Sequence, residues 1–84
     1  MDNITPEIVR TLLDTLVTPK SDLIVDYDIN TRKYYGGKTG IEIDVIMERE
    51  YNYNREIEYD LERRIKNVMR DLSPAFTLVK FYIK

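Results

Sequence analysis

The sequence predicts one α+β domain over residues 1–84, with the element order helix–strand–strand–helix–strand. Three observations lead to this fold class. Two segments place apolar residues at intervals of three and four, which is the spacing of an amphipathic helix. Two segments between them alternate apolar and polar residues, as half-buried strands do. The last segment is rich in β-branched and aromatic residues, which favour strands.

The first helix is predicted to begin after Thr5 and to end before Pro19. Thr5 can cap the helix, and Pro6 suits the first helical position because its missing N–H would have no partner there. Pro19 cannot continue a helix, so the segment stops there. Between these limits lies a wide apolar stripe that consists of Ile8, Val9, Leu12, Leu13, Leu16 and Val17.

Residues 22–30 and 41–48 are predicted to be two strands of a hairpin. The apolar residues at alternate positions should face the core, and Ile24 and Ile46 are the apolar exceptions on the other side. The link over residues 31–39 contains the adjacent glycines Gly36 and Gly37, which mark a turn. The core-facing residues are Leu23, Val25, Tyr27 and Ile29 in one strand and Ile41, Ile43, Val45 and Met47 in the other.

A second helix and a third strand complete the order. Asn52 or Asn54 can cap the helix, Ser73-Pro74 stops it, and its apolar residues from Ile57 to Leu72 recur at intervals of three and four. The run Phe76–Ile83 is the last strand. We expect Thr77, Val79, Phe81 and Ile83 to face the core, because Lys80 and Lys84 then lie in water beside acidic residues.

These elements predict a two-layer α+β sandwich with a three-stranded mixed sheet. We expect the strand order 2-1-3, with the first strand in the middle, and both helices on one face. The other face is then open to solvent. On the hairpin strands it should carry the carboxylates of Asp22, Asp26, Asp28, Glu42, Asp44 and Glu48.

The composition excludes several kinds of chemistry. The chain has neither cysteine nor histidine, so disulfides, thiolate catalysis, cysteine-ligated metals and histidine acid–base catalysis are ruled out. No apolar run approaches the about 20 residues that a membrane span needs. We expect a cytoplasmic protein, located in the host cytoplasm or in a virion if a phage encodes it. The net charge of −2 gives little attraction for nucleic acid in general.

The open face also predicts where a partner binds. Apolar side chains that point into water and lie together often mark an interface. Edge strands also bind extended partners. Tyrosines in the hairpin link add contact area at low entropy cost. The candidate partner-binding residues are Ile24, Ile46, Phe76, Leu78, Tyr82, Tyr34 and Tyr35.

The hairpin link allows a second interpretation, nucleic-acid binding. Residues 32–38 carry three basic side chains and no acid. Cations mixed with aromatics can follow phosphates and stack bases. The candidate residues are Arg32, Lys33 and Lys38. A phosphate loop is rejected because Arg32 stands where its first glycine should be, and because the link joins two strands.

Two resemblances bear on the fold. Gly37-Lys38-Thr39-Gly40 resembles the Gly-x-x-Gly loop of KH domains, which joins two helices and clamps the nucleotide backbone. The element order resembles part of one KH arrangement. The opening helix over residues 5–13 and the element order resemble the small scaffold-type iron–sulfur assembly domains. Those domains carry their chemistry on cysteines, so no functional residue carries over to this chain.

We therefore expect a small non-enzymatic protein-interaction or assembly module, such as an adapter or a phage or virion component. It would bind a protein partner, or itself, through the open face and the last strand. The alternative is a KH-like domain that binds RNA or single-stranded nucleic acid through the hairpin over residues 32–38. We expect no catalytic residue, no cofactor and no membrane association. We also expect no metal site, because carboxylates spaced along flat strands do not converge on one point.

Overall fold

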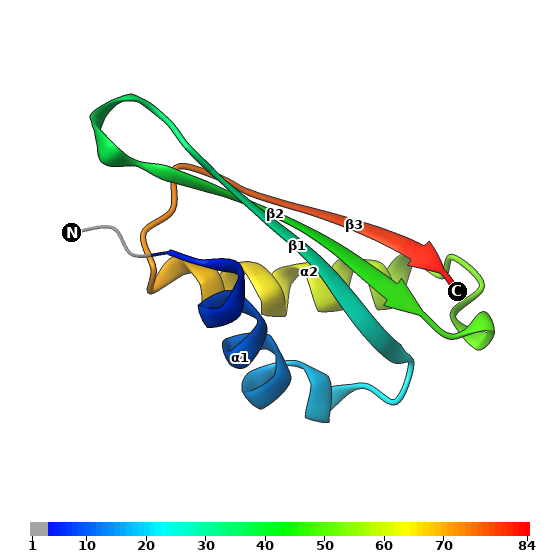
Figure 1. The fold of residues 1–84 in the computed structure, drawn as a ribbon. Coiled ribbons are helices and arrows are strands. Elements are labelled where there is room, and N and C mark those ends of the chain that lie inside the picture. The colour runs from blue at the N-terminus through cyan, green and yellow to red at the C-terminus, as the bar shows by residue number, and fades with distance from the viewer. Residues whose placement is uncertain (1–3) are drawn as a thin grey trace.

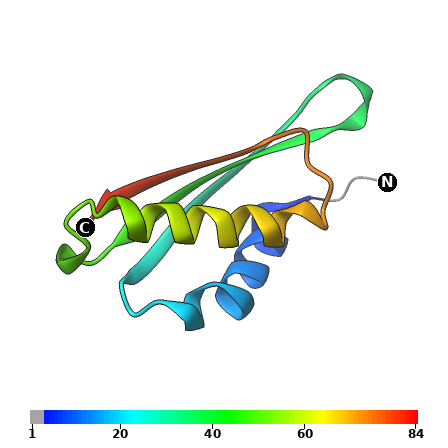
Figure 2. The same cartoon turned by 180° about the vertical axis from the view of Figure 1, so that it is seen from behind.

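The computed structural model describes residues 4–84 and confirms the α+β class with the element order α-β-β-α-β. Both helices pack against one face of a three-stranded mixed sheet, and the other face is open (Figures 1 and 2). The elements are α1 (Pro6–Leu16), β1 (Ile24–Lys33), β2 (Thr39–Met47), α2 (Arg55–Arg70) and β3 (Thr77–Ile83).

Both helices begin at the caps that the sequence predicts. The Thr5 hydroxyl accepts a hydrogen bond from the Ile8 N–H at 3.2 Å. The Asn54 side chain accepts from the N–H groups of Glu56 and Ile57 at 2.9 and 3.3 Å. Each cap satisfies N–H groups that have no partner inside the helix.

The strand order differs from the prediction. The sheet has the order β1-β2-β3, so β2 lies in the middle instead of the first strand. β1 pairs with β2 antiparallel and β3 pairs with β2 parallel. The physical reason is burial, because the inward residues Ile41, Ile43 and Val45 of β2 are completely covered. A strand with such a continuous apolar row gains most from the centre of a sheet.

The start of β1 also differs from the prediction. A bulge interrupts the pairing between Ile24 and Asp26, and Ile24 pairs with Met47. Ile24 therefore packs against the core, and Val25 is exposed instead. A bulge adds one residue to one strand and so reverses the facing of the residues before it. Asp22 lies in a turn before β1 and leaves the open face.

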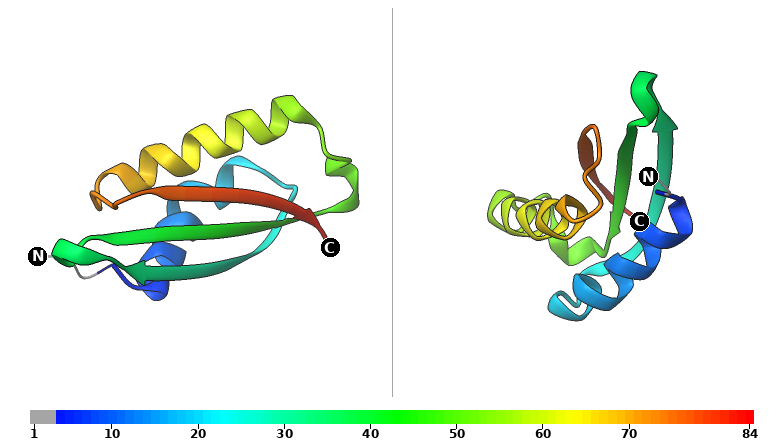
Figure 3. Two further views of the ribbon diagram at one scale, coloured as in Figure 1. Left: turned by 90° about the horizontal axis from the view of Figure 1, so that it is seen from above. Right: turned by 90° about the vertical axis from the view of Figure 1, so that its left-hand side faces the viewer.

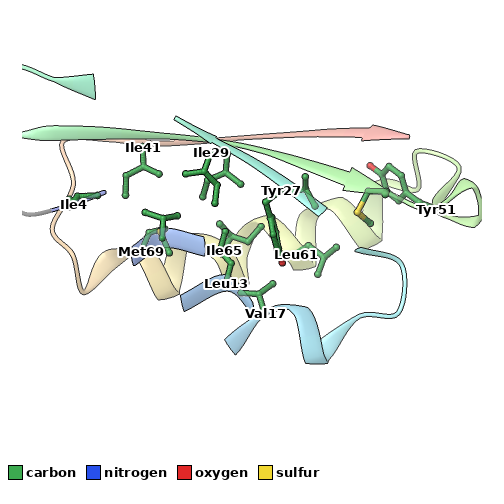
Figure 4. Close-up of a cluster of buried hydrophobic side chains, with 14 residues drawn as sticks. Ile4, Leu13, Val17, Tyr27, Ile29, Ile41, Tyr51, Leu61, Ile65 and Met69 are labelled. Carbon is green, nitrogen blue, oxygen red and sulfur yellow. The ribbon is translucent and has the colours of Figure 1, made fainter. Parts of the chain in front are cut away.

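One hydrophobic core joins the sheet to both helices (Figure 4). Helix α1 contributes Val9 and Leu13, and α2 contributes Leu61, Ile65 and Met69. The core thus forms between the helix layer and the inner face of the sheet. In β3 the residues Thr77, Val79, Phe81 and Ile83 are half-buried and the residues between them are exposed, which confirms the predicted facing of this strand.

Candidate protein interface on the open sheet face

The open face is a grid of side chains that point away from the helices. Its members are the even-numbered residues of β2 and β3 and those of β1 from Asp26 onward, because beyond the bulge in β1 the odd-numbered positions such as Tyr27 and Ile29 face the core. The register places them in three full rows, each written from β1 to β3: Asn30–Glu42–Leu78, Asp28–Asp44–Lys80 and Asp26–Ile46–Tyr82. Arg32 pairs with Gly40, which lies against the Phe76 ring just before β3.

Three large apolar side chains lie on the β3 side of the open face, Phe76 directly before β3 and Leu78 and Tyr82 within it on either side of Lys80, and we call them the apolar row. Leu78 and Tyr82 are each 44% exposed and Phe76 is 38% exposed. Ile46 lies beside Tyr82 in register and is half-buried. Apolar side chains that remain in water next to one another gain free energy when a partner covers them.

Gly40 on β2 lies beside Phe76, the first residue of the apolar row. A Cβ atom at this position would lie only 2.4 Å from Cε2 of the Phe76 ring. The ring therefore lies against the glycine, where no side chain could fit. Tyr34 meets the same ring edge-on, with the ring centroids 5.6 Å apart. Sequence reasoning assigned Gly40 to a loop motif and missed this role on the strand.

Four carboxylates lie beside the apolar row and form what we call the acidic cluster: Asp26, Asp28, Glu42 and Asp44. Two of them have cationic partners, since Asp26 pairs with Arg10 at 2.9 Å and Glu42 with Arg32 at 3.6 Å. The hydrogen bond from Arg10 holds the pKa of Asp26 below its usual value.

Asp28 and Asp44 are in a different situation. They lie directly opposite each other on β1 and β2, and neither has an ion-pair partner within residues 4–84. Like charges at directly opposite positions destabilise a sheet. Lys80 is the next residue in their row, but it forms no ion pair within residues 4–84. The fold therefore keeps a local excess of negative charge at this point.

The two sheet edges offer unequal access. Ile41 N donates to Phe76 O and Lys84 N donates to Met47 O, each at 2.9 Å, so the even-numbered residues of β3 bond to β2. The odd-numbered peptide groups of β3 then point to the free edge. Helix α2 runs alongside this edge (Figure 3). On β1, Arg10 donates to the Tyr27 carbonyl and so occupies part of the other edge.

The hairpin tip, residues 32–38, extends beyond the helices (Figure 1). Gly36 and Gly37 have φ values of 80° and 76°, which side chains disfavour, so both glycines are needed for the turn. Tyr35 is fully exposed at the tip, and Lys33 and Lys38 are exposed on either side of it. Arg32 pairs with Glu42 and therefore belongs as much to the open face as to the tip.

The structure brings most of the predicted partner-binding residues together. Phe76, Leu78, Tyr82 and Ile46 share the open face, and Tyr34 joins them through Phe76. The prediction is wrong for Ile24, which packs against the core. Tyr35 lies apart from the others at the hairpin tip. The nucleic-acid candidates Lys33 and Lys38 stay near Tyr35. The KH-like glycine segment lies between the tip and β2, and not between two helices.

Two further properties concern residues 4–84. In this range no group of three or more carboxylates is placed to hold a metal ion. No helix in this part of the chain is both long enough and apolar enough to cross a membrane. A second apolar surface lies between α1 and the end of α2, where a hollow of about 430 Å³ is lined by Glu7, Ile8, Thr11, Leu12 and Leu72.

Comparison with protein-family models, with curated proteins and with solved structures gives no match for this chain.

Proposed function

We propose that this protein is a non-enzymatic interaction module that binds a protein partner, or a copy of itself, through the open face. The observation that carries the proposal is the apolar row beside the acidic cluster. A stable folded domain has no need of a half-exposed Leu78 and Tyr82 near two facing aspartates that form no ion pair within residues 4–84. Both features become favourable when a partner covers the row and supplies positive charge.

The free edge of β3 is the secondary element of this proposal. Its outward peptide groups can bond to an extended segment, which is a recurrent mode of recognition. Helix α2 runs beside this edge, so a segment bound there must lie toward the open-face side. The edge and the apolar row would then be covered by the same partner.

The test replaces two residues of the apolar row by Leu78→Asp together with Tyr82→Asp. Both side chains are partly exposed, so the fold should survive, and circular dichroism checks this. The matched control is Leu16→Asp with Tyr59→Asp, which adds the same charge at exposed apolar positions on the helices. We expect the open-face variant to lose partners and self-association that the wild type and the control retain. A folded open-face variant that keeps the same partners and the same mass in solution refutes the proposal.

Nucleic-acid binding through the hairpin tip is the second candidate function. The observation that favours it is the fully exposed Tyr35 between Lys33 and Lys38, an aromatic ring and two cations free to meet a base and its phosphates. It predicts binding of single-stranded RNA or DNA that weakens steeply with salt and disappears in Lys33→Ala with Lys38→Ala. No detectable binding at low salt would end this interpretation.

A further inference from the structure

We propose that the open face of one molecule receives the hairpin tip of a second copy of this chain, in a head-to-tail contact. This inference rests on the proposed function, because it uses the same open face and names the partner. It identifies that partner from charge complementarity within the chain itself.

The complementary charges are on two separate surfaces. At the tip, Lys33 and Lys38 are exposed and take part in none of the ion pairs within residues 4–84. On the open face, Asp28 and Asp44 are the two members of the acidic cluster without an ion pair in the same range. Two unpaired cations thus correspond to two unpaired anions that repel each other.

One molecule cannot bring these charges together. Lys33 and Asp28 lie on the same strand, β1, which runs without interruption from Ile24 to Lys33. Lys38 is next to the start of β2, which carries Asp44. The tip is a continuation of the sheet and cannot fold back onto it. Within one molecule Lys80 lies beside Asp44 in register without forming an ion pair in the described part of the chain, so the tip lysines can reach Asp28 and Asp44 only on another molecule.

The apolar groups match in the same arrangement. Tyr35 is fully exposed at the tip, between Tyr34 and the two glycines. The apolar row lies directly beside the acidic cluster. Leu78 and Tyr82 flank Lys80 at the end of the Asp28–Asp44 row, so Tyr35 of a tip placed over this row would lie close to one of these two apolar side chains. Buried aromatic anchors of this kind commonly carry much of the free energy of an interface.

A symmetric face-to-face dimer is less favourable on the same observations. A two-fold axis through the middle of the open face places β2 against β2 of the other copy. If the axis runs along β2, Glu42 and Asp44 face their own copies, which adds repulsion between carboxylates across the interface. The tip-to-face contact avoids this because each contact joins a basic surface to an acidic one.

A head-to-tail contact uses two different surfaces, so each molecule keeps a free tip and a free face. Such contacts give open chains or closed rings and do not stop at a dimer. The tip is small compared with a standard interface of about 1,600 Å², so the contact should be weak. Because charges dominate it, salt should weaken it further.

The experiment measures the mass of the full chain in solution by light scattering. The wild type is followed up to about 1 mM, the weak end of measurable affinities, in about 0.01 M salt, where charges act over about 30 Å. The tip variant is Lys33→Glu with Lys38→Glu, and the face variant is Asp28→Lys with Asp44→Lys. Within each variant the tip and the face have the same sign, so each alone should stay monomeric. An equimolar mixture of the two should associate again.

The control variant, Lys20→Glu with Arg55→Glu, changes the net charge as much as the tip variant does, but at exposed positions outside both surfaces. It should associate as the wild type does. If the face variant does not fold, Asp28→Asn with Asp44→Asn replaces it as a test of the face. This variant should have a lower mean mass in solution than the wild type at the same concentration.

Three results overturn the inference. They are a wild type that is monomeric over the whole concentration range, a tip variant that associates as well as the wild type, and a mixture that stays monomeric. The second result indicates a face-to-face dimer. A monomeric wild type whose partners depend on Leu78 and Tyr82 leaves the proposed function intact and assigns the open face to a different protein.

Discussion

The contact between Gly40 and Phe76 allows a prediction whose magnitude follows from the structure. The change is Gly40→Ala, which adds one methyl group to β2 under the Phe76 ring. The new Cβ would lie 2.4 and 2.5 Å from two ring carbons. Carbon atoms prefer a separation of about 3.5–4.0 Å, so the ring must move by about 1 Å or more. It then loses its contact with Tyr34 and exposes the end of the apolar row.

Two opposing effects set the size of the change in stability. Overpacking of this kind costs about 1–3 kcal/mol, and the lost edge-on contact with Tyr34 accounts for about 0.5–1.5 kcal/mol of that cost. Replacing glycine by alanine in a strand returns about 0.5–1 kcal/mol. The difference of these ranges spans about 0–2.5 kcal/mol, and because the clash is severe we expect Gly40→Ala to lower the free energy of unfolding by about 1–2.5 kcal/mol. For a domain of this size each kcal/mol corresponds to about 4–8 °C in Tm.

The assay is a double-mutant cycle measured by urea and thermal unfolding. In a Phe76→Ala background the added methyl group meets no ring, so Gly40→Ala should there stabilise the protein by about 0.5–1 kcal/mol. The change of sign between the two backgrounds is the signature of the contact. If Gly40→Ala has the same effect in both backgrounds, the ring does not lie over the glycine and the reasoning is refuted.

Three other substitutions test separate parts of the structure. The Thr39 hydroxyl is buried and has no hydrogen-bond partner within residues 4–84, so Thr39→Val should raise the free energy of unfolding by about 1 kcal/mol in urea unfolding, whereas Thr39→Ser should not. Arg10 lowers the pKa of Asp26, so in acid the unfolded chain binds more protons than the folded one. The resulting stabilisation is complete above the unfolded pKa of about 3.9 and is lost as the pH falls toward the lower folded pKa. Asp26→Asn should therefore make the fall of stability in acid less steep in a stability–pH profile. Burial and the hydrogen bond to Glu58 raise the pKa of Tyr51. The contribution of Tyr51 to stability is therefore complete below the unfolded pKa of about 10 and is lost as the pH rises above it. Tyr51→Phe should make the fall of stability in alkali less steep and lower the free energy of unfolding at pH 7 by about 0.5–1.5 kcal/mol.

The local elements follow from the sequence because their signals are local. Thr5 and Asn54 cap the two helices as expected. The ion pairs Asp60–Arg64 and Glu62–Lys66 form at 2.9 Å, as acid-first pairs four residues apart should. The alternation in β3 gives the correct facing because Lys80 cannot be buried without a partner. Each of these inferences needs only a few neighbouring residues.

The strand order depends on a comparison between segments. Both hairpin strands have an apolar inner row, so either could lie in the middle. The difference lies in continuity. The inner row of β2 is apolar from Ile41 to Met47, whereas that of β1 changes to Thr31 after Ile29. Consecutive strands are also usually neighbours in a sheet. Together these two signals favour the order 1-2-3, which the structure has.

The bulge in β1 shows a limit of alternation itself. Leu23, Ile24 and Val25 are all apolar, so this part of the strand carries no period-two signal, and either facing buries one or two of them. In the structure Ile24 pairs with Met47 and packs against the core. The role of Gly40 lay beyond any local pattern for a similar reason. It depends on Phe76, which lies far along the chain and reaches β2 only through the crossover by α2.

The open face combines features that a sheet optimised only for stability would lack. Asp28 opposite Asp44 costs cross-strand stability, and a pair of threonines there would be more favourable. Leu78 and Tyr82 remain half exposed on the adjacent strand, although polar residues would serve as well for folding. Positions that lower stability without a structural gain are commonly those used for binding. Because the repulsion and the exposed apolar surface lie side by side, one basic partner with an aromatic anchor would relieve both. The hairpin tip of this same chain carries these groups.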